Sequence, residues 1–159
     1  MNAVHPVETP TTLQAAESLQ DILAELIDLS LQLKEAHWNV VGPRFRSVHL
    51  ELDEILLVVR DGYDEIAERI RALGHAASGG VAVIKQRSKL TPFPEGTVKD
   101  MQVVELISER LAQVCDGTRA HIPTLGDLDP ISEDMVIGLT GNLEKAKWMM
   151  TAQFEEGSR

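Results

Sequence analysis

Apolar residues recur every three or four positions along four long stretches of the chain, which is the period of an amphipathic α-helix. The first stretch carries leucine and isoleucine at the repeating positions, with polar residues between them. The pattern predicts one helix in each stretch, with Thr12 or Thr9-Pro10 at the N-cap of the first. The expected helices span residues 12–41, 44–73 and 97–121, followed by a fourth that opens at Asp129-Pro130 or Ser132.

Glycine and proline separate these stretches. Gly42-Pro43 should close the first helix, because proline disfavours helix in the residue before it, and Gly74 should cap the second. Residues 74–97 are rich in Gly, Ser and Pro, and they form a connection too long for a tight turn, with a short helix expected around residues 81–87. Two prolines and a glycine in residues 122–130 should separate the third helix from the fourth.

The order of these elements predicts an all-α fold, a four-helix bundle with a long crossover carrying a short helix between the second and third helices. A chain of 159 residues suits one domain, residues 1–159, with residues 1–11 as an N-terminal arm. Hydrophobic residues make up 43% of the chain and aromatic residues only 4%, which favours packed helices over an aromatic-rich sandwich.

The formal charge of −10 bears on partners and location. Such an acidic chain attracts cations and repels nucleic acid unless basic groups gather in a tail, and residues 1–33 contain no Lys or Arg. No apolar run has the length of a membrane span, and no signal-peptide pattern opens the chain. The lone Cys115 lies in an apolar pattern typical of a buried thiol, so we expect a reducing cytoplasm.

Two histidines flank the Gly42-Pro43 break symmetrically. His37 lies six residues before Pro43, and His49 lies six residues after it. If the two helices fold back as an antiparallel hairpin, these side chains come level across their interface. Paired imidazoles are good ligands for iron or zinc, so the spacing indicates a candidate metal site.

Carboxylates on the second helix extend this candidate site. Asp53 lies one turn after His49, and Asp64 and Glu68 form a further i, i+4 pair. His49 and Asp64 are about 22 Å apart along one helix, at roughly 1.5 Å per residue, so one subunit cannot bring both groups to one ion. An antiparallel two-fold partner centred near Val58, in the apolar run ILLVV, would bring them together.

Each of these side chains also has an ordinary structural explanation. A carboxylate on a helix is usually solvated surface, and a lone histidine is more often structural than a ligand. It is the joint pattern of symmetrical histidines, paired carboxylates and an apolar centre that favours a shared metal site over an amphipathic helix with a charged face.

The motif HWNVVGP, followed by Phe45, resembles the Dps family, the DNA-binding proteins from starved cells, which are ferritin-like mini-ferritins. The resemblance extends over nearly the whole chain, because LEKAKWMM in the fourth helix also matches the family's C-terminal pattern. It also includes the spaced set His37, His49, Asp53, Asp64 and Glu68.

The resemblance implies a function. Family members form hollow dodecamers with ferroxidase centres between subunits. By position, one subunit would supply His37, His49 and Asp53 to the iron, and its two-fold mate Asp64 and Glu68. The implied chemistry is oxidation of Fe(II) to Fe(III), with hydrogen peroxide in preference to dioxygen, and storage of ferric oxide in the cavity. Consuming iron and peroxide together would protect DNA and the cell from oxidative damage.

The resemblance also suggests roles outside the centre. The segment GDLDPISED gathers acids where the family has pores at a three-fold axis, so Asp129 and Asp134 are candidates to line an iron pore. Helix capping is the alternative, since acids suit a helix N-terminus, and Pro130 stands where some relatives have another acid. Trp38 and Trp148 are core aromatics or electron donors, and we expect Trp148 in the core.

Two other functions remain open. The family's name-giving activity, nucleoid DNA binding, often uses lysine-rich tails, and the cluster Lys85, Arg87 and Lys89 in the crossover is more typical of a solvated loop. A di-iron bundle that activates oxygen for organic substrates would take Glu-x-x-His ligands from one chain, and no such pair occurs on paired helices. No role is assigned to three further histidines, His5, His75 and His121.

Overall fold

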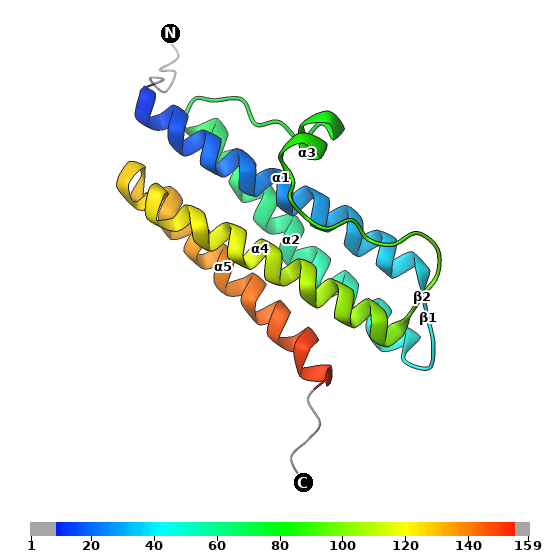
Figure 1. Ribbon diagram of the computed structural model, residues 1–159. Coiled ribbons are helices and arrows are strands. Elements are labelled where there is room, and N and C mark those ends of the chain that lie inside the picture. Colours follow the sequence, from blue (N-terminus) through cyan, green and yellow to red (C-terminus); the bar gives the residue numbers. More distant parts are fainter. Residues whose placement is uncertain (1–8, 155–159) are drawn as a thin grey trace.

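The computed structural model describes residues 9–154 and confirms the predicted four-helix bundle (Figure 1). Helix α1 packs mainly against α2, and α4 packs mainly against α5. The four long helices are α1 (Pro10–Asn39), α2 (Phe45–Ala72), α4 (Asp100–Leu128) and α5 (Pro130–Thr151). The shorter elements are α3 (Val81–Arg87), a 3-10 turn η1 (Ala152–Phe154) and the two-residue strands β1 (Val40–Val41) and β2 (Val98–Lys99).

The N-termini of α1 and α5 follow the predicted capping chemistry. Thr9 caps α1 in a capping box with Thr12, and Pro10 occupies the first turn. Asp129 caps α5 by accepting a hydrogen bond from the backbone N–H of Ser132. The predicted N-terminal arm falls mostly on residues 1–8, which lie outside the described residues, as does His5.

Three predicted helix boundaries were wrong. The first helix ends at Asn39 rather than Val41, and α4 begins at Asp100 rather than at residue 97, because Val40 and Val41 pair in parallel with Val98 and Lys99. The third helix continues past His121 to Leu128 and contains Pro123. Proline within a helix loses one hydrogen bond and crowds the preceding turn. Here that cost is offset by apolar burial, since Leu125 is fully buried. Asp129 alone connects α4 to α5.

Branched aliphatic side chains from all four long helices fill the core. Cys115 is buried among them, which confirms the buried free thiol predicted from the sequence, and burial raises the pKa of this thiol to about 11. None of the helices in residues 9–154 combines the length and apolar character that a membrane crossing needs. The largest fully buried side chains are Leu19, Ile22, Leu23, Leu26, Leu29, Leu33, Leu52, Ile66, Ile70, Ile107, Leu111 and Leu125.

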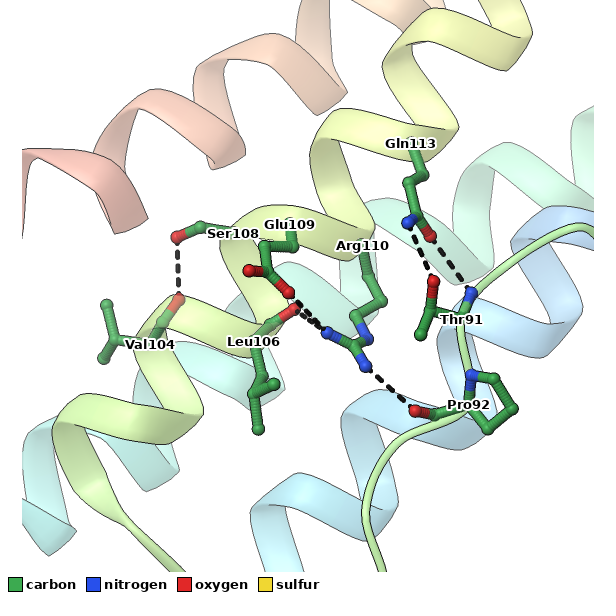
Figure 2. A network of polar contacts seen from close by, with 8 residues as sticks. All are labelled: Thr91, Pro92, Val104, Leu106, Ser108, Glu109, Arg110 and Gln113. Atoms are coloured by element: carbon green, nitrogen blue, oxygen red, sulfur yellow. Dashed lines mark hydrogen bonds and ion pairs between the residues drawn. The ribbon is translucent and has the colours of Figure 1, made fainter.

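The crossover runs the length of the bundle beside α1 and is tied to α4 by polar contacts (Figures 1 and 2). Buried Arg110 donates a hydrogen bond from Nη2 to the carbonyl oxygen of Pro92 at 2.9 Å. The amide of Gln113 donates to Thr91 Oγ1 at 3.0 Å and accepts from the Thr91 backbone N–H at 3.1 Å. These bonds satisfy backbone groups that the irregular crossover would otherwise leave unpaired.

The turn between α1 and α2 depends on Gly42. Its φ of 137° is unfavourable for any residue with a side chain, and an added Cβ would lie 2.5 Å from Asp100 Oδ2. That carboxylate accepts a hydrogen bond from the Arg44 backbone N–H at 2.6 Å. The turn that sets α1 against α2 is therefore locked to the start of α4.

The substitution Gly42→Ala should lower the free energy of unfolding by about 1–3 kcal/mol, because it adds strain at positive φ and displaces Asp100. Urea unfolding followed by circular dichroism measures the change. Gly141→Ala on α5 is the matched control, since its Cβ would meet nothing within 4 Å, and it should be neutral or stabilising. Equal stability of the two variants would show that the turn tolerates a side chain.

Candidate metal centre

The ends of the α1–α2 hairpin bring His37 and His49 together. Their rings stack with centroids 3.6 Å apart and an angle of 23° between planes. This confirms that residues equally spaced from the Gly42-Pro43 turn come level across the two helices. His37 is buried and His49 half-buried, so the pair lies at the edge of the core.

Each histidine is fixed by the backbone of the other. His37 Nδ1 donates to the carbonyl oxygen of His49 at 3.0 Å, and His49 Nδ1 donates to the carbonyl oxygen of His37 at 2.9 Å. A carbonyl oxygen only accepts, so in both rings the proton must be on Nδ1. A neutral ring with that tautomer keeps its lone pair on Nε2, the arrangement of a metal-binding histidine.

Asp53 adds a carboxylate beside this pair. Its Oδ1 lies 3.3 Å from His37 Nδ1 and accepts a hydrogen bond from Lys34 Nζ at 3.0 Å. The Lys34 hydrogen bond, with the nearby imidazoles, holds the pKa of Asp53 below its usual value despite partial desolvation. Asp53 is therefore ionised at neutral pH, as a metal ligand must be.

Lys34 and Arg69 contact candidate site residues and were not identified from the sequence. Lys34 Nζ forms an ion pair with Asp53 and also lies 5.9 Å from the centre of the Trp38 ring, in cation–π range. A lysine three residues before His37 lies on the same helix face, and this spacing could have revealed it. Arg69 binds Asp129 through Nη2 at 2.6 Å.

Asp64 and Glu68 lie apart from the histidines on the exposed face of α2. Neither side chain makes a hydrogen bond or ion pair within residues 9–154 of the single chain. No group of three or more His, Cys, Asp or Glu that could hold a metal forms among those residues. That absence includes the set His37, His49 and Asp53, so the five-ligand site shared between subunits stays a prediction.

The exposed face of α2 between the two groups carries aliphatic side chains at the predicted two-fold centre, among the charged Glu54, Arg60 and Asp61. Leu57 is 62% exposed, and the adjacent Val58 is half-buried. Leu50, two turns earlier on the same face, is also exposed. Exposed aliphatic side chains between charged ones are typical of a surface that another protein copy covers.

The candidate pore residues differ in what they contact. Asp129 accepts hydrogen bonds from Arg69 and Ser132. Burial acts to raise the pKa of Asp129, but these hydrogen bonds have the larger combined effect and hold the pKa below its usual value. Asp134 is exposed and makes no polar side-chain contact within the described part of the chain. Asp134 is thus the more available of the two for a passing cation.

Both tryptophans lie on the surface of the single chain. Trp38 is 70% exposed and Trp148 is 61% exposed. The expectation that Trp148 belongs to the core was wrong, because Leu143, Ala146 and Met150 occupy the buried side of α5 and Trp148 projects from the other side.

A family model described as a ferritin-like domain matches residues 16–159. A relative from Mycolicibacterium smegmatis named "DNA protection during starvation protein" is 40% identical over 143 residues, which cover 88% of this chain and 76% of the relative. The chain belongs to the Dps family.

Solved Dps structures agree with this assignment. DpsA14 from Streptomyces coelicolor superimposes with a TM-score of 0.91 at 34% identity, covering 97% of this chain and 92% of that one. A tetragonal form of Mycobacterium smegmatis Dps gives 0.90 at 32% identity, covering 99% and 96%. Names within these relatives vary, since a Haemophilus ducreyi protein 39% identical over 143 residues, 90% of this chain and 76% of its own, is called "Fine tangled pili major subunit".

Proposed function

We propose that this Dps protein oxidises Fe(II), its substrate, at centres shared by two subunits and stores the ferric product. The observation that carries the proposal is the histidine pair. The reciprocal Nδ1 hydrogen bonds hold two Nε2 lone pairs ready, with the ionised Asp53 beside them. Imidazole nitrogens suit Fe(II) and carboxylate oxygens suit Fe(III), so the ligand set favours the oxidation.

The second half of each centre would come from a two-fold partner. An antiparallel pairing of α2 with its copy about Val58 would place the partner's Asp64 and Glu68 opposite His49. Both carboxylates are exposed and without a polar contact within the described residues, which leaves them available. Membership of the Dps family supports assembly of such dimers into a hollow dodecamer.

The proposed oxidant is hydrogen peroxide, used in preference to dioxygen. Two Fe(II) ions each lose one electron to one peroxide molecule, the O–O bond breaks, and two protons complete two water molecules. The Fe(III) then hydrolyses to ferric oxide inside the shell. The net charge of −10 per chain would concentrate iron near the protein, and Asp134, with Asp129 beside it, would line the route inward.

Stepwise addition of oxidant to the assembled wild-type protein tests this proposal. Fe(II) is added without air, peroxide or air follows in separate samples, and ferric absorbance is recorded with time. We expect fast oxidation by peroxide, slower oxidation by air, and a product that stays soluble. Precipitation of the iron at the rate seen without protein would contradict the proposal.

Protection of DNA by direct binding is the alternative, favoured by the names of the relatives. The crossover cluster offers less free positive charge than its sequence suggests, because Arg87 is paired with Glu17 and Asp21 of α1. Binding through a basic surface would weaken steeply as salt rises, so a gel-shift titration over salt, with and without Mg²⁺, separates it from cation-bridged contact.

The lysine at the site should compete with metal. Lys34→Gln removes the cation bound to Asp53, so Zn²⁺, which is not oxidised, should bind about two- to fivefold more tightly, the range for a partly exposed ion pair. Calorimetric titration measures the change. Lys85→Gln on α3 alters the charge equally at an exposed position away from the site. An equal effect of both substitutions would point to overall charge rather than competition at Asp53.

A further inference from the structure

A pocket of roughly 370 Å³ lies between α1, α4 and the crossover, apart from the histidine pair and the α2 carboxylates. Glu25 of α1 lines it on one side. Lys89 and Leu90 come from the crossover, and Asp116, Gly117 and His121 come from α4. None of these residues has a place in the proposed iron chemistry.

Glu25 is the unusual member of this pocket. It is only 8% exposed, yet its carboxylate makes no hydrogen bond or ion pair within residues 9–154. Burial raises the pKa of Glu25, and the nearby Asp21 and Asp28 raise it further, while Lys89 acts in the opposite direction from beyond ion-pair distance. The carboxylate oxygens of Glu25 are not fully buried, so they are reached from the pocket rather than sealed in the core. Partial desolvation without a protein partner still costs stability, and a ligand with N–H donors would offset that cost.

Gly117 of α4 lies opposite Glu25 and leaves room for its carboxylate. A Cβ added to Gly117 would lie 2.5 Å from Glu25 Oε2, so any larger residue would push the carboxylate aside. Glycine within a helix is less favourable than alanine. Two locally unfavourable residues, Glu25 and Gly117, thus meet at one point of the pocket.

The other residues that line the pocket indicate which class of ligand it could bind. Asp116 offers acceptor oxygens, and burial lowers the pKa of His121, so its ring is neutral near pH 7 and also carries an accepting nitrogen. Leu90 is buried and supplies an apolar wall. The volume exceeds that of a bare ion. An occupant with several N–H donors, a positive charge and an aliphatic part fits these features.

We propose that this pocket binds a small alkylammonium ion, whose N–H groups donate to Glu25 and whose chain packs against Leu90. Asp116 and His121 are the further acceptors. The site is independent of iron oxidation, so the protein would carry two separate cation-binding functions, one for a transition metal and one for an organic amine.

Calorimetric titration of the assembled protein with n-butylammonium tests the proposal. Tetramethylammonium has the same charge but no N–H donor, and it should bind at least about tenfold more weakly. Glu25→Gln should weaken n-butylammonium binding by about ten- to a hundredfold, the effect of losing a charge-assisted hydrogen bond. Glu105→Gln, at an exposed position of α4 outside the pocket, makes the same change in net charge and should leave the affinity unaltered.

Several outcomes would overturn the proposal. Equal binding of the two ammonium ions, or equal affinity of Glu25→Gln and Glu105→Gln, would reduce the effect to general attraction by an acidic surface. Displacement of the amine by an equal concentration of Mn²⁺ would mark a metal site instead. Gly117→Ala, which keeps the charge but crowds the carboxylate, should also weaken binding, and unchanged affinity would contradict the assigned position of the ligand.

Discussion

Replacing His37 and His49 together with alanine should slow peroxide-driven oxidation of Fe(II) by about a hundredfold or more, since even groups that only orient metal ligands contribute ten- to a hundredfold. The double variant loses both Nε2 donors and the two hydrogen bonds that fix the rings. Only carboxylates would remain at the centre, and these hold Fe(II) less well than imidazole does. Stopped-flow absorbance after anaerobic loading measures the rate.

The control for this variant separates chemistry from folding. His75→Ala removes a histidine that contacts Thr12 at the far end of α1, so it should oxidise iron like the wild type. Thermal unfolding and size-exclusion chromatography show whether each variant still assembles. An assembled His37→Ala/His49→Ala protein that retained the wild-type rate would remove the histidine pair from the proposed centre.

Mixing two inactive variants should restore activity. One variant is His37→Ala/His49→Ala, and the other is Asp64→Asn/Glu68→Gln, which keeps side-chain shape while removing charge. If each centre uses ligands from two chains, a mixed dimer holds one centre with all its ligands and one that retains only Asp53. Random pairing makes about half of the dimers mixed, so co-assembled protein should recover about a quarter of the wild-type rate.

The design of the mixing experiment distinguishes shared centres from centres within one chain. Co-expression gives the mixed assembly, and the two variants purified separately and combined without exchange give the control. We expect activity only after co-assembly. Recovery of no activity at all, from mixed assemblies of normal size, would mean that the two ligand groups do not serve one ion across the two-fold axis.

The hairpin that carries the site was predictable because the signal was local. Gly42-Pro43 marks the turn, and equal spacing on each side brings His37 level with His49 whatever the rest of the fold does. The separation of Asp64 from His49 was also predictable, since the rise per residue of a helix fixes it. Family resemblance and helix periodicity then agreed on the bundle.

The features that were missed depend on contacts between segments distant in sequence. Pro123 predicts a helix break, but α4 continues past it because Leu125 is buried in the core. Val40 pairs with Val98, which lies 58 residues later in the chain, where the crossover returns to the α1–α2 hairpin. The position of Trp148 on the surface likewise follows from which side of α5 faces its neighbours. Local propensity cannot decide such cases.

The distance along α2 between the histidine pair and Asp64 has a consequence for the life of a newly made chain. With the proposed ligands divided between copies, a solitary chain can hold iron weakly at either half but cannot complete the reaction. Oxidation then switches on only when two chains meet, and its rate per chain should fall on dilution below the dissociation constant of the dimer. Iron oxidation would in this way be confined to protein that has already begun to assemble into its shell.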